Sequence, residues 1–207
     1  METSGLSAAQ PLLVLVIGIP GSGKTFFARQ FSDSYKFFCL DSGKFESELQ
    51  DLNSSYEDVS KVSNKLVENT YDQALKAFRH IILTGSYNNV KQRNEVITKA
   101  QKSGYRTLIV WVQTDEETAK FRATNRDKRR LDDRGSVQLT EDEFTEQSKN
   151  FKKPDLKNES FVVISGKHDF KSQSVIVLKK IASMYMNNLN NNSSSSSSIS
   201  STRTVLR

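Results

Sequence analysis

One glycine-rich stretch constrains this chain more than any other feature. Residues 18–25 read Gly-Ile-Pro-Gly-Ser-Gly-Lys-Thr, which fits the spacing G-x-x-x-x-G-K-[ST]. An apolar run from Leu12 to Ile17 precedes the stretch, and a run compatible with a helix, from Phe26 to Phe31, follows it. Strand, turn and helix in this order are the context that the spacing requires. The sequence therefore predicts a fold built around a tight turn between a buried strand and a helix.

The residue types of this turn are suited to binding an anion. Its glycines allow positive φ, so the backbone can curl with its N–H groups pointing inward. The following helix N-terminus adds unpaired N–H groups and a favourable dipole. We expect Lys24 to reach the β- and γ-phosphates of a nucleoside triphosphate and Thr25 to ligate Mg²⁺. The alternative is a glycine-rich turn that binds nothing. The residues expected to contact the nucleotide are Gly18, Pro20, Gly21, Ser22, Gly23, Lys24, Thr25 and Phe26.

Composition narrows the class of protein further. The 207 residues are enough for one domain with tails. The lone cysteine, Cys39, excludes an internal disulfide, and its apolar neighbours predict a buried side chain in a reducing compartment. The two histidines are far apart, so the pattern contains no zinc site. The formal net charge of +6 permits phosphate-rich partners but does not demonstrate nucleic-acid binding.

The two ends of the chain differ in composition from its middle. Residues 1–10 are small and polar and carry no basic leader, and we expect them to be flexible. The run 12–17 is too short to span a bilayer, so we expect a cytoplasmic protein without a membrane partner. From Asn187 the chain is rich in Asn and Ser, which predicts a disordered tail over 187–207. The domain is therefore expected over residues 11–186.

Between these ends, apolar runs alternate with helical patterns. The runs predict strands at 12–17, 37–40, 81–83, 108–112 and 161–165. We expect Gly43 to break the chain after the second strand. Apolar spacings of three and four predict helices over 56–78, from 90 to about 104, and from 172 to about 186. Strands alternating with helices indicate an α/β fold with a mainly parallel sheet.

Two further helices carry start signals. Thr114 to Glu117 and Thr140 to Glu143 both have the residue types of a capping box. The first predicts a helix that runs through a basic stretch to about Asp132. The second predicts a short helix that ends before Pro154.

Asp41 is the candidate catalytic carboxylate. It ends the strand taken to neighbour the glycine turn, and open α/β sheets bind ligands at the carboxyl ends of their strands. At that place it could accept a proton from a hydroxyl that attacks the γ-phosphate. The alternative is that Asp41 only caps a helix or a turn.

The stretch from Lys120 to Arg134 is strongly basic. Arg122, Arg126 and Arg130 recur every four residues, so on one helix they would form a stripe. Such a stripe could close over a nucleotide and stabilise a phosphoryl group during transfer. The alternative is a solvated basic face with Asp127 and Glu117 as ion-pair partners. Lys167 and His168, after the last strand, could border the nucleotide base or form a polar turn.

With these pieces in place the chain resembles the P-loop kinases of the polynucleotide kinase and zeta-toxin type, from about Leu12 to Tyr185. The marks are the turn at 18–25, the acid at Asp41, an arginine in the helix after the third strand (Arg93), and an R-x-x-x-R lid (Arg122 and Arg126). The resemblance implies a three-layer fold with a five-stranded sheet in the order 2-3-1-4-5 and an arginine-bearing helical lid at about 114–150. It also implies an ATP–Mg²⁺ donor, Asp41 as general base, and lid arginines on the phosphates.

The chain departs from the pattern of that family at two positions. Thr84 stands where members usually end the third strand in an aspartate that holds water on Mg²⁺. Lys44 stands where members often have the arginine of D-x-x-R, and lysine lacks the bidentate fork of arginine.

Three hypotheses of function follow. The first is an ATP-dependent kinase that phosphorylates a hydroxyl of a small molecule or a polynucleotide. The second, favoured by Thr84, is a nucleotide-binding switch or degenerate kinase that hydrolyses ATP slowly. The third is nucleic-acid binding through the basic stretch, which predicts an affinity that falls steeply with salt.

Overall fold

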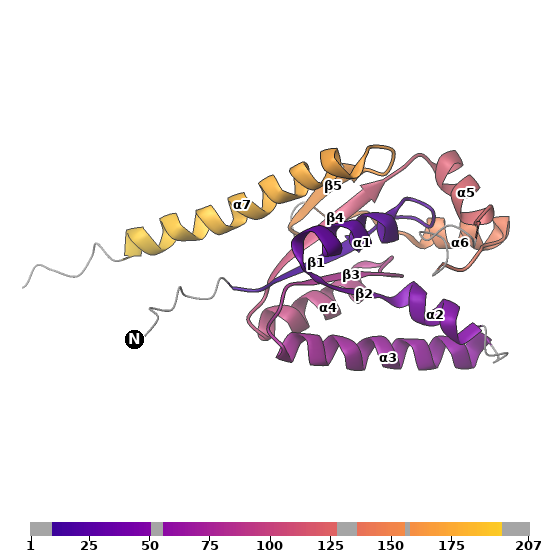
Figure 1. The fold of residues 1–207 in the computed structure, drawn as a ribbon, viewed down its shortest axis with the longest axis horizontal. Helices are drawn as coiled ribbons and strands as arrows, with labels where there is room; N and C mark the ends of the chain where they lie inside the picture. Colours follow the sequence, from indigo (N-terminus) through magenta and orange to yellow (C-terminus); the bar gives the residue numbers. More distant parts are fainter. Residues whose placement is uncertain (1–9, 51–55, 128–135, 156–157, 196–207) are drawn as a thin grey trace, which may run out of the picture.

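The chain forms a sheet of parallel strands with helices on both faces (Figure 1). The computed structural model describes residues 10–50, 56–127, 136–155 and 158–195. In this part of the chain the elements are, in order, β1 Leu12–Ile17, α1 Lys24–Tyr35, β2 Phe38–Asp41, α2 Ser42–Gln50, α3 Tyr56–Lys76, β3 Ile81–Thr84, α4 Val90–Lys102, β4 Arg106–Gln113, α5 Glu116–Thr124, α6 Glu141–Asn150, β5 Phe161–Ser165 and α7 Phe170–Ser195.

The described strands form one five-stranded sheet in the order β2-β3-β1-β4-β5, and every pairing is parallel. β1 lies at the centre, where Val16 stands opposite Thr84 of β3 and Val110 of β4. All residues of β1 are buried, as is typical of a strand covered on both faces. The predicted α/β fold and its strand order are confirmed, and the five predicted strands are found within one or two residues of their expected bounds.

Alternate residues of β1 belong to two hydrophobic layers. Leu13 and Leu15 pack with residues of α3 and α4, whereas Val14 and Val16 pack with residues of α1 and α7. Figure 1 shows these helix pairs on opposite sides of the sheet. The sheet is therefore the middle of three layers, and its buried faces hold the strand ends in fixed positions.

The remaining helices gather beyond the carboxyl ends of the strands. Figure 1 shows α2, α5 and α6 at that end of the molecule. Helices α5 and α6 form a small core of their own from Ala119, Ala123 and Phe144, all fully buried. This end of an open parallel sheet is where ligands bind in α/β folds.

Two predicted breaks in the chain are wrong. Helix α2 starts directly after Asp41 and includes Gly43, whose N–H donates to Asp41 Oδ1 at 3.2 Å. Because this bond satisfies an N–H group of the first turn, glycine is accommodated there instead of ending the element. The last helix continues past residue 186 to Ser195, since residues 170–195 contain neither proline nor glycine to stop it. Of the flexible ends predicted over 1–10 and 187–207, residues 1–9 and 196–207 lie outside the described residues, and residues 187–195 belong to α7. Among the described helices, none combines the length and the apolar character needed to cross a membrane.

Candidate active site

The glycine turn adopts the backbone conformations that its sequence predicts. Gly18, Gly21 and Gly23 have φ angles of 153°, 73° and 102°, which side chains other than glycine rarely adopt. Gly23 is the N-cap of α1 in a left-handed conformation, so the turn ends on the helix N-terminus. The N–H groups of this end lie where an anion is stabilised.

The turn is also packed too closely for side chains. A Cβ on Gly21 would lie 2.0 Å from the carbonyl oxygen of Ala119 in α5, and one on Gly18 would lie 2.5 Å from the carbonyl oxygen of Val112 in β4. On its other flank, the Thr114 hydroxyl donates to the Ser22 carbonyl at 3.0 Å. The turn is therefore held against β4 and α5 by close backbone packing and by one side-chain hydrogen bond from Thr114.

Lys24 lies within this turn. Its Nζ donates to the carbonyl oxygens of Gly18 and Ile19, both at 2.9 Å. Burial, together with the charge of Arg126, lowers the pKa of Lys24 to about 8, while the charge of Asp41 opposes this change. The ammonium group is thus surrounded by the glycine turn, an arginine from the lid and a carboxylate from β2.

Asp41 lies at the carboxyl end of β2, but β2 is not the neighbour of β1. Thr84 of β3 stands between them, opposite both Asp41 and Val16. The Asp41 carboxylate caps α2 and also accepts from Arg29 Nη2 at 3.3 Å. Burial raises the pKa of Asp41, and the charges of Arg29 and Lys24 and the bond from Gly43 oppose this. Asp41 therefore caps a helix, as the alternative interpretation has it, and its role as a base stays a prediction.

Sequence reasoning missed Arg29. The side chain is 30% exposed and comes from the second turn of α1. A signal was available, because Arg29 follows Thr25 by four residues and therefore lies on the same face of the helix.

Thr84 occupies the end of β3 and is almost completely buried, at 1% exposure. Its hydroxyl oxygen has no hydrogen-bond partner among the residues that the structure describes. The position between the glycine turn and Asp41 therefore carries an uncharged, unsatisfied hydroxyl group.

The predicted arginine stripe is wrong for Arg126. Helix α5 ends at Thr124, and Asn125 is its C-cap. Residues returning toward α6 bind its last carbonyls: Gln138 Nε2 donates to the Thr124 oxygen at 2.7 Å, and the Leu139 N–H to the Ala123 oxygen at 3.1 Å. Because those carbonyls accept from a side chain and from the backbone of the segment before α6, the helix ends at Thr124 and not at about residue 132 as predicted.

The two arginines nevertheless lie at the glycine turn. Arg122, on α5, donates from Nη1 to the Gly166 carbonyl at 3.1 Å. Gly166 packs against Ser22 of the glycine turn. Arg126, beyond the helix, lies near enough to Lys24 to lower its pKa. Arg130 and the rest of the basic stretch, Lys128, Arg129, Asp132, Asp133 and Arg134, lie outside the described residues. Lys120 forms an ion pair with Glu141 at 2.6 Å.

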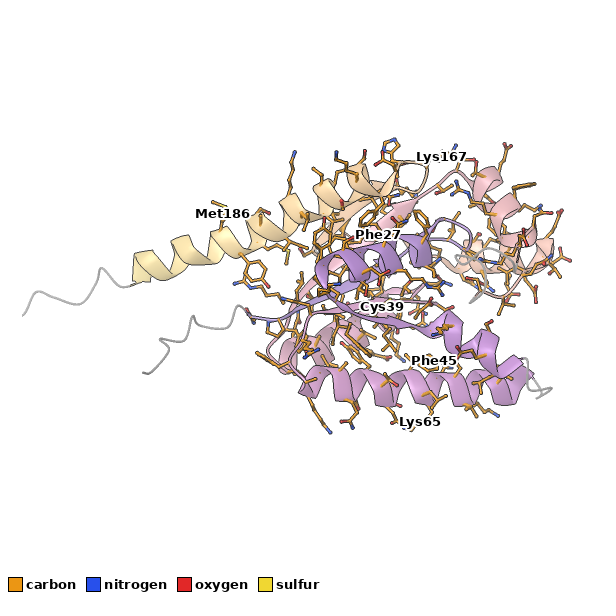
Figure 2. All side chains as sticks on the ribbon, viewed as in Figure 1. Phe27, Cys39, Phe45, Lys65, Lys167 and Met186 are labelled. Carbon is orange, nitrogen blue, oxygen red and sulfur yellow. The ribbon has the colours of Figure 1, made fainter. Side chains whose placement is uncertain are left out.

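The capping predictions for the lid have different outcomes. The box at Thr140–Glu143 is confirmed in both directions. The box at Thr114 is wrong: Asp115 is the N-cap, and it accepts from the Thr118 N–H at 2.9 Å. The Thr114 hydroxyl is used instead by the Ser22 carbonyl. Lys167, labelled in Figure 2 on the loop after β5, forms an ion pair with Asp115 that holds the pKa of this carboxyl well below its usual value.

Arg93 is placed away from the glycine turn and is completely buried. Its Nε and Nη2 donate to Glu159 Oε1 and Oε2 at 2.7 and 3.1 Å, and its Nη1 donates to the Lys152 carbonyl at 2.9 Å. Glu159 Oε2 also accepts from the Asp155 N–H at 2.9 Å. Arg93 therefore anchors the segment after α6 to helix α4.

Comparison with known proteins agrees with this architecture. A family model described as "AAA domain" matches residues 13–154. No curated protein matches the chain by sequence.

Three solved structures are similar in fold. A protein provisionally assigned as a kinase from Chloroflexus aurantiacus shares 14% identity at a TM-score of 0.65, covering 85% of this chain and 99% of that chain. A sugar kinase from Janibacter sp. HTCC2649 shares 15% identity at a TM-score of 0.60, covering 84% of this chain and 95% of that chain. A gluconokinase from Sinorhizobium meliloti 1021 shares 13% identity at a TM-score of 0.56, covering 87% of this chain and 97% of that chain. The fold of this chain is thus also found in proteins described as kinases.

Proposed function

The chain belongs to the AAA domain family, and from that premise we propose that it is a kinase that transfers the γ-phosphate of ATP to a hydroxyl group. The acceptor class is a small molecule or the end of a polynucleotide. One observation carries the proposal: the Lys24 ammonium lies in a glycine turn on a helix N-terminus, where the charges of Arg126 and Asp41 both act on it. Phosphoryl transfer needs this combination of cations and a carboxylate.

The residues of the turn fit a nucleotide. A Cβ on Gly18 or Gly21 would overlap neighbouring backbone, so the curled turn needs glycine at these two positions. The turn leads directly into the N-terminus of α1, whose free N–H groups favour an anion. Lys24 now donates to two carbonyls of the turn, and we expect it to exchange them for phosphate oxygens. Pro20, Ser22 and Phe26 border the same turn, and Thr25 would contribute its hydroxyl to Mg²⁺. The magnesium ion, when bound, would neutralise phosphate charge during transfer.

The residues then divide the reaction between them. Asp41 takes the proton of the acceptor hydroxyl, and the hydroxyl oxygen forms a bond to the γ-phosphorus. The bond between that phosphorus and the β–γ bridging oxygen breaks, and ADP leaves with the electron pair. Lys24 and Arg126 stabilise the charge on the phosphoryl oxygens. Burial raises the pKa of Asp41, which makes it a better proton acceptor near neutral pH.

A second candidate is a nucleotide-binding switch that hydrolyses ATP slowly. The buried, unpartnered hydroxyl of Thr84 favours it, because a neutral group anchors water on Mg²⁺ less strongly than a carboxylate does. Both candidates require nucleotide binding, so they differ only in whether an acceptor is phosphorylated.

The test uses γ-labelled ATP and a panel of hydroxyl acceptors: oligonucleotide 5′ ends, nucleosides, sugars and amino sugars. We expect one acceptor to be labelled by the wild type and not by Asp41→Asn. Asparagine caps a helix as well as aspartate does, so this variant removes the base and keeps the start of α2. Equal labelling by both proteins would exclude Asp41 as the base.

Two further results separate the candidates. Release of labelled phosphate with no labelled acceptor would favour the switch. Calorimetry with ATP and Mg²⁺ should show binding that Lys24→Ala abolishes. No heat of binding for the wild type would exclude both candidates.

A further inference from the structure

The contact between Arg29 and Asp41 links a helix to a strand of the sheet. Arg29 extends from α1, and Asp41 ends β2, which is an edge strand. The guanidinium Nη2 lies 3.3 Å from Asp41 Oδ2, and the carboxylate is only 7% exposed. The helix that begins at the glycine turn therefore reaches across to the candidate base.

The second oxygen of the same carboxylate is also held. Asp41 Oδ1 accepts from the Gly43 N–H at 3.2 Å. With one oxygen bound by a main-chain donor and the other by a guanidinium, the plane of the carboxylate is fixed. Each oxygen keeps a further lone pair with which to accept a proton.

Lys44, the residue at the D-x-x-R position, does not perform this task. Its Nζ lies 3.7 Å from Glu48 Oε1, and both side chains are about 60% exposed. This is a surface pair one helical turn apart, which contributes little to stability. The guanidinium that meets Asp41 comes from α1 instead.

We propose that Arg29 is the positioning residue of the active site: it holds the Asp41 carboxylate ionised and fixed in orientation for proton transfer. This inference rests on the proposed kinase function and adds to it a residue that acts through the base. Arginine suits the role because it stays charged at every relevant pH and donates along a rigid fork. Its charge offsets the burial that would otherwise protonate Asp41.

Two other ionisable groups in the described part of the chain lie near Asp41 and bear on its charge. Lys24 faces it from the start of α1 and helps to keep it charged. Cys39, two residues earlier on β2, is a thiol whose pKa burial raises to about 11, so it is neutral at physiological pH. Arg29 is therefore the cation whose removal we expect to change the titration of Asp41 most.

The experiment measures the pKa of the Asp41 carboxyl by carbon-13 NMR in the nucleotide-free full chain. Three variants are compared with the wild type: Arg29→Gln, Arg29→Lys and Arg79→Gln. Arg79 precedes β3 at the amino end of the sheet, so its variant is a matched control for the loss of one arginine. We expect Arg29→Gln to raise the pKa of Asp41 by about 1 or more, Arg29→Lys to restore most of the wild-type value, and Arg79→Gln to leave it unchanged.

The same variants are then assayed for phosphate transfer across pH. In Arg29→Gln the acidic limb of the kcat profile should move upward with the pKa of Asp41, while the KM for ATP stays within about twofold of the wild type. An unchanged pKa of Asp41 in Arg29→Gln would overturn the inference, and so would a raised pKa with an unshifted acidic limb. If the pKa rises but the wild type labels no acceptor, the kinase proposal fails while the electrostatic role of Arg29 is confirmed. Recovery by Arg29→Lys shows that an effect of Arg29→Gln does not come from a misfolded helix.

Discussion

The glycine turn and the arginine lid meet at Gly21 and Ala119, yet they are held by different kinds of contact. The turn is fixed by backbone: positive φ angles and approaches so close that a Cβ would overlap a carbonyl. The lid is fixed largely by side chains: within it Gln138 donates to the Thr124 carbonyl, and from outside it Arg93 of α4 donates to the segment after α6. A rigid turn beside a lid that is anchored through side chains can keep its shape while the lid arginines change position.

The largest effect is expected where the lid is anchored. Arg93→Met leaves the Glu159 carboxylate, 2% exposed, buried without its partner, and breaking such a pair costs about 3–5 kcal/mol. The double variant Arg93→Met with Glu159→Leu removes both charges and should be clearly more stable than the single variant. Denaturant unfolding measures the free energy of unfolding of the single and the double variant. If the single variant is as stable as the wild type, the ion pair does not anchor the lid.

The folded double variant then distinguishes the two regions. Because the hydrogen bond from Arg93 to the Lys152 carbonyl is lost, amide hydrogen exchange should accelerate in α6 while α1 stays protected. Equal acceleration in α1 and α6 would show that turn and lid are one cooperative unit.

The next effect concerns the turn itself. Gly21→Ala combines a positive φ with a Cβ 2.0 Å from the Ala119 carbonyl oxygen, whereas Gly104→Ala has a similar φ but meets only Phe78 at 3.5 Å. Both variants carry the cost of placing alanine at a positive φ, so the difference between their losses in free energy of unfolding isolates the packing of the turn against the lid. We expect Gly21→Ala to lose about 1–3 kcal/mol more than Gly104→Ala and to weaken ATP binding at least tenfold. Equal losses would mean that α5 yields at no cost.

The same contrast explains what could be predicted from sequence. The turn depends on neighbours in sequence, so its spacing and glycines define it, and the five strands follow from their apolar runs. The end of α5 depends on hydrogen bonds from Gln138 and Leu139. Asp115 rather than Thr114 caps the start of α5 because the Thr114 hydroxyl donates to the Ser22 carbonyl. Pattern alone cannot reveal these long-range competitors. The helical spacing from Thr25 could have placed Arg29 on the face of α1 that carries Thr25, but not its pairing with Asp41, which lies on another element.

A smaller effect tests how much of the lid depends on its own helix. The Thr140 side chain caps α6 in a reciprocal capping box, and Asn89 caps α4 in the same way. Thr140→Ala and Asn89→Ala should each cost about 1 kcal/mol, measured by denaturant unfolding. Only Thr140→Ala should raise hydrogen exchange in α6. If Asn89→Ala has the same effect there, α4 and α6 unfold together.

The smallest effect is a dependence on pH at the base of β1, the strand that leads into the turn. His80 Nδ1 accepts from the Leu12 N–H at 3.0 Å, so the neutral ring is the form that makes this bond, and burial lowers the pKa of His80. A depressed pKa in the folded state means that the stabilisation is complete above the ordinary value of about 6.5 and is lost as the pH falls below it. His80→Gln should remove this loss, measured by unfolding between pH 7.5 and 5, whereas His168→Gln should retain it. A loss that persists in His80→Gln would assign the acid sensitivity to another group. Hydrogen exchange at pH 5 should then increase in β1 before it increases in α6, because the bond supports the strand beneath the turn and no part of the lid.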